Sequence, residues 1–63
     1  MVVVYSYGKT YNVEKLAENY WRTAGGRAYI REEDGFFIVY AANGDRKGIR
    51  RTFEDAVVKA YEV

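Results

Sequence analysis

The sequence predicts a small α+β domain with the element order β-α-β-β-β-α, in which two amphipathic helices pack on one face of a sheet. Three features predict this fold: an apolar run near the N-terminus, two stretches with the apolar spacing of a helix, and two turn dipeptides between residues 27 and 51. A chain of 63 residues has the size of one small domain. We therefore expect a single domain over residues 1–63.

The first strand and the first helix are predicted in the N-terminal third of the chain. Val2-Val3-Val4-Tyr5 is a β-branched and aromatic run, which is typical of a strand. A helix is predicted at about residues 13–24, capped by Asn12 and ended by Gly25-Gly26. Its apolar residues recur on one helical side: Val13, Leu16, Ala17, Tyr20, Trp21 and Ala24. A helical crossover would make the first strand parallel to its partner, either the second or the fourth strand.

An antiparallel three-stranded meander is predicted for residues 27–51, and a second helix follows it. Asp34-Gly35 and Asn43-Gly44 are dipeptides that favour two-residue hairpin turns. The second helix is predicted at about residues 53–62, where apolar residues again recur on one side, and Thr52 is its expected N-cap.

Two-residue turns fix the register of the meander, so the residues that share each face follow from the sequence. The first face is apolar, apart from Glu32, Arg46 and Arg50 near the strand ends, and its small residues would let a helix approach closely. We expect this face to be the core: Ala28, Ile30, Phe37, Val39, Ala41 and Gly48. The second face combines apolar side chains with four cations: Tyr29, Phe36, Ile38, Tyr40, Ile49, Arg27, Arg31, Lys47 and Arg51. The alternative is that the second face is the core, with its Arg and Lys side chains extending along it into water.

A face that places cations among aromatic rings suits nucleic acid, because cations attract phosphates and rings stack on bases. The sequence therefore predicts a small, non-enzymatic nucleic-acid-binding module. Contacts to phosphates or base edges are expected from four residues: Arg27, Arg31, Lys47 and Arg51. Tyr29 and Tyr40 are expected to form a stacking or packing surface, and Arg46 and Arg50 to add backbone contacts at the hairpin.

Two other functions remain open at this point. Tyr and Arg are also enriched where proteins bind one another, so the same surface fits a protein-binding miniprotein, such as a small phage-type inhibitor or a homodimeric module. A homodimer could form through an exposed edge strand. The absence of His, Cys and Pro, together with regular turns and capped helices, also fits a designed or consensus-like scaffold without a ligand.

Enzymatic, metal and cofactor functions are not expected. The chain has no His and no Cys, so its Ser and Thr hydroxyls have no imidazole to activate them. Gly8-Lys9-Thr10 matches only the end of a phosphate-binding loop, and we interpret it as a strand-to-helix turn. Glu32-Glu33-Asp34 is interpreted as a solvated turn and not as a metal site.

The net charge is +1, and the chain carries no export signal or apolar run long enough for a membrane span. We therefore expect a cytoplasmic protein without a membrane partner.

Two known families resemble parts of the predicted element order. Residues 27–63, a meander with a basic hairpin followed by a helix, resemble the arm-site-binding domains of tyrosine recombinases, which implies a sheet that binds in the DNA major groove. Residues 12–63, read as α-β-β-β-α, resemble the double-stranded-RNA-binding domain. That family has a basic cluster at the start of its last helix, where this chain has Thr52-Phe53-Glu54-Asp55.

Overall fold

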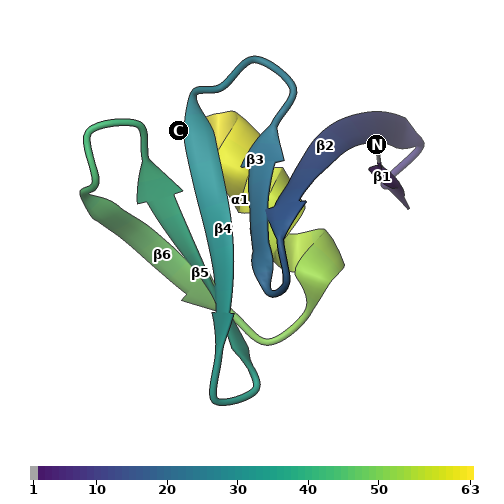
Figure 1. Ribbon diagram of the computed structural model, residues 1–63. Helices are drawn as coiled ribbons and strands as arrows, with labels where there is room; N and C mark the ends of the chain where they lie inside the picture. The colour runs from purple at the N-terminus through teal and green to yellow at the C-terminus, as the bar shows by residue number, and fades with distance from the viewer. Residues whose placement is uncertain (1) are drawn as a thin grey trace.

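One meander of antiparallel strands forms the sheet, and a C-terminal helix covers one of its faces (Figure 1). The computed structural model describes residues 2–63. Within these residues the elements are β1 (Val2–Ser6), β2 (Lys9–Ala17), β3 (Tyr20–Thr23), β4 (Ala28–Glu33), β5 (Phe36–Ala41), β6 (Arg46–Arg50) and α1 (Phe53–Glu62). Each strand pairs with the next one along the chain, so the sheet order is β1-β2-β3-β4-β5-β6. The α+β class is as predicted, but the element order is not.

The predicted C-terminal helix is confirmed as α1. Thr52 has extended backbone angles, and its hydroxyl oxygen accepts a hydrogen bond from the Asp55 amide at 3.2 Å. This contact satisfies one of the amides that the first turn of a helix leaves without a backbone partner. Glu54 and Asp55 in the first turn and Lys59 in the last turn also oppose the partial charges of the helix ends.

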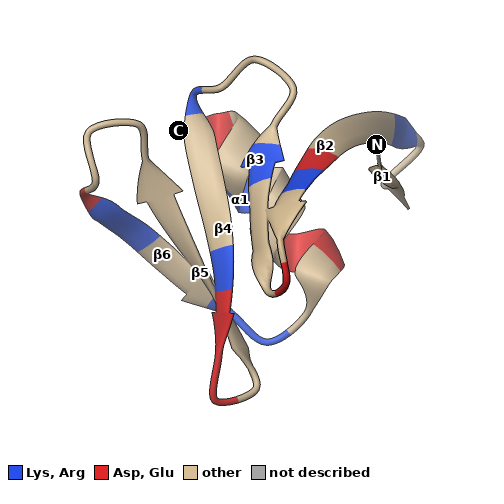
Figure 2. Ribbon diagram, viewed as in Figure 1, with Lys and Arg blue, Asp and Glu red and all other residues tan. Residues whose placement is uncertain are grey.

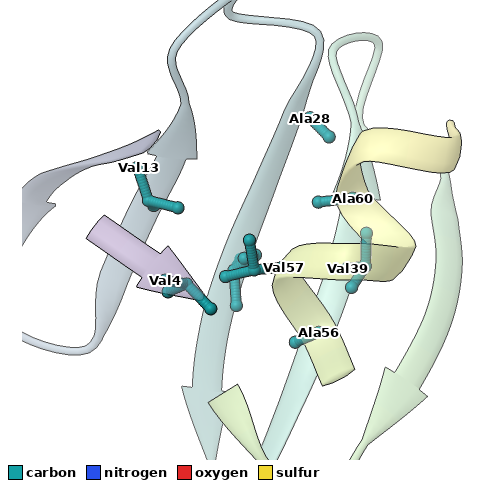
Figure 3. Close-up of a cluster of buried hydrophobic side chains, with 8 residues drawn as sticks. Val4, Val13, Ala28, Val39, Ala56, Val57 and Ala60 are labelled. Carbon is teal, nitrogen blue, oxygen red and sulfur yellow. The ribbon is translucent and has the colours of Figure 1, made fainter. Parts of the chain in front are cut away.

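The core lies between α1 and the sheet. Val57 of α1 is fully buried against the strands, as are Val13, Ile30 and Val39. Ala56 and Ala60 extend the contact along the helix, and Figure 3 shows these small side chains between the helix and the sheet. The face expected to be the core of the meander is therefore the face that α1 covers, although one helix covers it instead of two.

The helix predicted at residues 13–24 is absent, and this prediction is wrong. The stretch forms the end of β2, a turn at Glu18-Asn19 and all of β3. Asn19 has a φ of 63°, a left-handed conformation that no residue of a regular α-helix adopts. The α-β-β-β-α order behind the resemblance to the double-stranded-RNA-binding domain is therefore also wrong.

Tertiary pairing explains why strands form here. β3 supplies hydrogen-bond partners to β4, which would otherwise be an edge strand, and β2 supplies them to β3. Trp21, on the apolar side of the predicted helix, is partly buried and packs against the core, with its ring centroid 4.9 Å from that of Phe53 and 6.0 Å from that of Phe37. Leu16, in contrast, is exposed, because the reversal at Asn19 separates it from the apolar residues that a helix would place beside it.

The first strand is antiparallel to its partner, so the predicted parallel arrangement is wrong. Tyr7 and Gly8 both have positive φ values, of 52° and 75°, and join β1 to β2 in a tight turn in which Ser6 pairs with Lys9. Gly8-Lys9-Thr10 is thus part of a hairpin and does not precede a helix. Asp34-Gly35 forms the same kind of turn, as predicted, with φ values of 51° and 81°.

The hairpin between β5 and β6 differs from the prediction by one residue. The Ala41 amide donates to the Asp45 carbonyl at 2.8 Å, so the loop has three residues instead of two, and Gly44 takes the left-handed position with a φ of 97°. A bulge follows, because Tyr40 pairs with Arg46 while Val39 pairs with Gly48. The predicted two-residue turn implies that Tyr40 pairs with Lys47, and this pairing is wrong.

Substitution of Asn19 distinguishes the turn from a helix. Ala is unfavourable in the left-handed region, so Asn19→Ala should lower the free energy of unfolding by about 1 kcal/mol, and Asn19→Gly should not. If residues 13–24 formed a helix, Asn19→Ala would be the more stable variant and Asn19→Gly the less stable one, because Ala favours a helix and Gly disfavours it. Urea unfolding of the two variants and the wild type measures this difference.

Removal of the central side chain of α1 should destabilise the fold. Val57→Ala leaves a cavity between α1 and the sheet and should cost about 2 kcal/mol of unfolding free energy. Val58→Ala, on the half-buried side of the same helix, is the matched control and should cost clearly less. Equal losses in urea unfolding would contradict this packing.

Candidate functional site

The face of the sheet opposite α1, called the open face below, carries no helix among residues 2–63 and faces the viewer in Figure 1. Cross-strand pairing places a row of side chains across it. Tyr29 of β4 pairs with Tyr40 of β5, Arg22 of β3 flanks them on one side and Arg46 of β6 on the other. Because directly paired residues share a face, two cations flank two tyrosines across the sheet.

Three tyrosines line a shallow hollow of about 410 Å³ on the open face. Tyr20 and Tyr29 stack with their ring centroids 5.7 Å apart and their planes 11° from parallel. Tyr40, Arg31 and the backbone of the hairpin at Ala41, Ala42 and Gly44 complete the lining. The hollow therefore offers flat aromatic surface, one guanidinium group and main-chain polar groups, which are the contacts that a planar heterocyclic ring can use.

Arg22, one of the two cations of this row, forms a salt bridge with an acidic neighbour. Its guanidinium group donates a hydrogen bond to the Glu14 carboxylate, which comes from the paired position on β2. This hydrogen bond, followed by the attraction of the negative charge, raises the pKa of Arg22 above its ordinary value. The pair reduces the net positive charge that Arg22 adds to the open face.

Arg31 and Arg46 are the cations available to a ligand. Both are exposed, and neither forms a salt bridge with any residue between Val2 and Val63. Arg31 lies at the centre of the open face, where it pairs with Tyr20 on one side and Ile38 on the other. Arg46 lies at the bulged start of β6, beside Tyr40.

Acidic residues occupy the opposite end of the open face. A second hollow, of about 480 Å³, shares Tyr20 and Arg31 with the first but is also lined by Glu18, Glu32 and Glu33. Figure 2 shows the acidic turn between β4 and β5 and the basic start of β6 at different ends of the sheet. A phosphate would be repelled near the acidic turn and attracted near β6.

An apolar cluster extends along β5 and β6 from the acidic turn. Ile38 of β5 points to the open face, yet only 8% of it is exposed, because its neighbours on that face cover it. Phe36 and Ile49 are more exposed, and the Arg51 guanidinium lies over the Phe36 ring at 5.9 Å from its centroid. Arg51 therefore packs on an aromatic ring, separate from the row of Tyr29 and Tyr40.

The structure brings together four of the eight residues expected to bind nucleic acid. Tyr29, Arg31, Tyr40 and Arg46 lie around the tyrosine hollow. The bulge explains the inclusion of Arg46, which the predicted register placed on the core face. Lys47 is the extra residue of the bulge and is exposed beside it.

The structure places two further predicted site residues away from the open face. Arg50 pairs with Phe37 on the helix side of the sheet and lines a small hollow with Asp55 and Lys59 of α1. Its guanidinium donates to the Ile49 carbonyl at 2.7 Å. Arg27 belongs to the loop before β4 and lies beside the last turn of α1.

Sequence reasoning missed Tyr20 and Arg22, because it placed both in a helix. A signal was present: Tyr20-Trp21-Arg22-Thr23 is rich in strand-forming residues and follows Asn19, which readily adopts a left-handed turn. That pattern favours a strand, but the apolar spacing favours a helix equally well, so only the pairing of β3 with β4 decides between them and places Arg22 opposite Tyr29.

Comparisons with known proteins give no family for this chain, since no family profile, no curated protein and no solved structure matches it. Within residues 2–63, no group of three or more acidic side chains is arranged to hold a metal ion. The one helix in the same range is too short to cross a membrane.

Proposed function

We propose that the open face binds nucleic acid, with an unpaired base against Tyr20, Tyr29 and Tyr40 and with phosphates held by Arg31 and Arg46. The observation that carries this proposal is the hollow in which three tyrosines and Arg31 meet, next to the unpaired Arg46. Aromatic stacking accepts any base, and Arg contacts to phosphate need no particular sequence. The expected function is therefore non-enzymatic binding with little sequence preference.

The geometry favours unpaired bases over a duplex. Tyr20, Tyr29 and Tyr40 line a shallow hollow, and stacking on a tyrosine ring is open only to a base that is not already stacked inside a helix. The acidic turn at Glu33-Asp34 would also repel a long rigid duplex laid along the strands. A flexible single strand can follow the basic end of the face and avoid that turn.

A protein ligand is the second candidate, and the apolar cluster supports it. Phe36 and Ile49 remain exposed beside Arg51, and a surface that combines aromatic residues, Ile and Arg resembles the centre of a protein interface. Binding there would depend on apolar contact and respond weakly to salt. The dependence of affinity on salt therefore separates the two candidates.

A salt titration with charge variants tests the nucleic-acid proposal. Fluorescence anisotropy with a labelled single strand of about 12 nucleotides should show binding that weakens with salt. Contacts from Arg31 and Arg46, with a third from Lys47 in the bulge beside Arg46, predict a slope of about −2 in a plot of log affinity against log salt. Replacing two of these cations, in Arg31→Gln/Arg46→Gln, should reduce the slope to about −0.7.

Arg50→Gln is the matched control, because Arg50 lies on the helix side and should leave the slope unchanged. Tyr40→Leu should weaken binding about tenfold without changing the slope, since it removes stacking and no charge. The proposal is rejected if the protein does not bind the single strand at low salt. It is also rejected if Arg50→Gln lowers the affinity and the salt slope as much as the double variant does.

Release of Arg22 from Glu14 should strengthen the same binding. Glu14→Gln removes a negative charge next to the row and leaves the Arg22 guanidinium without its ionic partner. Affinity for the single strand should rise several-fold, with a steeper salt slope, because one more cation can contact phosphate. Glu62→Gln, which removes an exposed carboxylate from α1, makes the same change in net charge and should have little effect.

A further inference from the structure

The two edges of the sheet differ in how they are protected from pairing with another strand. β1 and β6 are the first and last strands of the sheet, so each pairs with another strand on one side only (Figure 1). β6 carries Arg46, Lys47 and Arg50 and begins with a bulge. Charges and bulges are the features by which natural edge strands discourage pairing, so the edge at β6 is protected.

β1 has none of these features. Its sequence, Val2-Val3-Val4-Tyr5-Ser6, contains no charge and no Pro, and all five residues pair with β2 without a bulge. Figure 2 shows β1 without a charged residue. About half of the backbone amide and carbonyl groups of such a strand point away from its one partner, where they are available to another strand.

The side chains of β1 add exposed apolar surface to this edge. Val3 is 59% exposed and Tyr5 is 69% exposed, and both lie on the same side of the sheet. Tyr7, in the turn that follows, is 88% exposed. A regular strand with exposed apolar side chains at an unprotected edge is a preferred site for the addition of a strand.

We propose that β1 pairs antiparallel with β1 of a second copy of this chain, about a two-fold axis perpendicular to the sheet. An uncharged strand can lie beside its own copy without like-charge repulsion, whereas the cations and the bulge of β6 oppose an open-ended chain of β1–β6 contacts. A two-fold axis at Val4 aligns all five residues and places Val3 beside Tyr5 of the second copy, on the same face. The result is a closed dimer with one continuous sheet.

The dimer would also join the two open faces into one surface, but the strand pairing does not depend on their ligand. One short strand from each copy forms a small interface, so association should be reversible and depend on concentration. Sedimentation equilibrium between about 10 μM and about 1 mM should therefore show the apparent mass rise from one chain towards two.

Charge placed on the edge tests the pairing directly. Val3→Lys and Val3→Glu should each keep the protein at the mass of one chain throughout that range, because the two residues at position 3 are diagonal neighbours about 7–8 Å apart in the proposed register. An equimolar mixture of Val3→Lys and Val3→Glu should recover association, because the charges are then opposite. Thermal unfolding at low concentration shows whether each variant remains folded.

Leu16→Lys is the matched control. Leu16 is exposed on β2, but it lies beyond the segment from Lys9 to Val13 that pairs with β1, so a charge there should leave association intact. Three results would each overturn the proposal. The wild-type protein could stay at the mass of one chain, Leu16→Lys could reduce association as much as Val3→Lys, or the mixture of the two Val3 variants could fail to associate.

Discussion

The close packing of α1 on the centre of the sheet is the contact on which the rest of the structure depends. The helix approaches closely because it presents Ala56 and Ala60 and because the strands below it present Ala28 and Gly48. At Gly48 a Cβ atom would lie 3.2 Å from Cε of Lys59, so an added methyl group would contact this side chain where it crosses the strand. Val57 then fills the space that these small residues leave.

This packing also determines which surface is available for binding. A ten-residue helix can cover only one face of the sheet, and the side chains that alternate away from it remain on the open face. The tyrosines and arginines of the open face are therefore held by a rigid sheet whose other side is the core. Their positions depend on strand register, so they do not require an ordered loop or a bound partner.

The open face and the β1 edge are separate features with different chemistry. The open face has mixed charge, with aromatic rings at its centre, and suits a charged ligand. The edge is uncharged and suits main-chain pairing. Because pairing through the edge would leave the open face uncovered, one chain could use both features at the same time.

Local patterns in the sequence were sufficient to predict an element wherever one short-range interaction dominates its conformation. Thr52 predicts the start of α1 because an N-cap acts within one turn, and Asp34-Gly35 predicts the β4–β5 turn because its left-handed φ values suit these residues. The division of the meander into a core face and an open face followed from that turn, and it placed Tyr29, Arg31 and Tyr40 on one surface. The same reasoning was wrong for Arg46 by one residue, because it did not anticipate the three-residue loop and the bulge.

The sequence by itself therefore determined α1 and the β4–β5 hairpin, which depend on short-range preferences, and it favoured the correct core face, although only the position of α1 excluded the other one. Tertiary structure alone decided the conformation of residues 13–24, whose apolar residues fit the spacing of a helix as well as two strands. The free energy that selected strands comes from hydrogen bonds to β4 and from the contacts of Trp21 with Phe37 and Phe53. These partners are distant in the sequence, so no window of neighbouring residues reveals them.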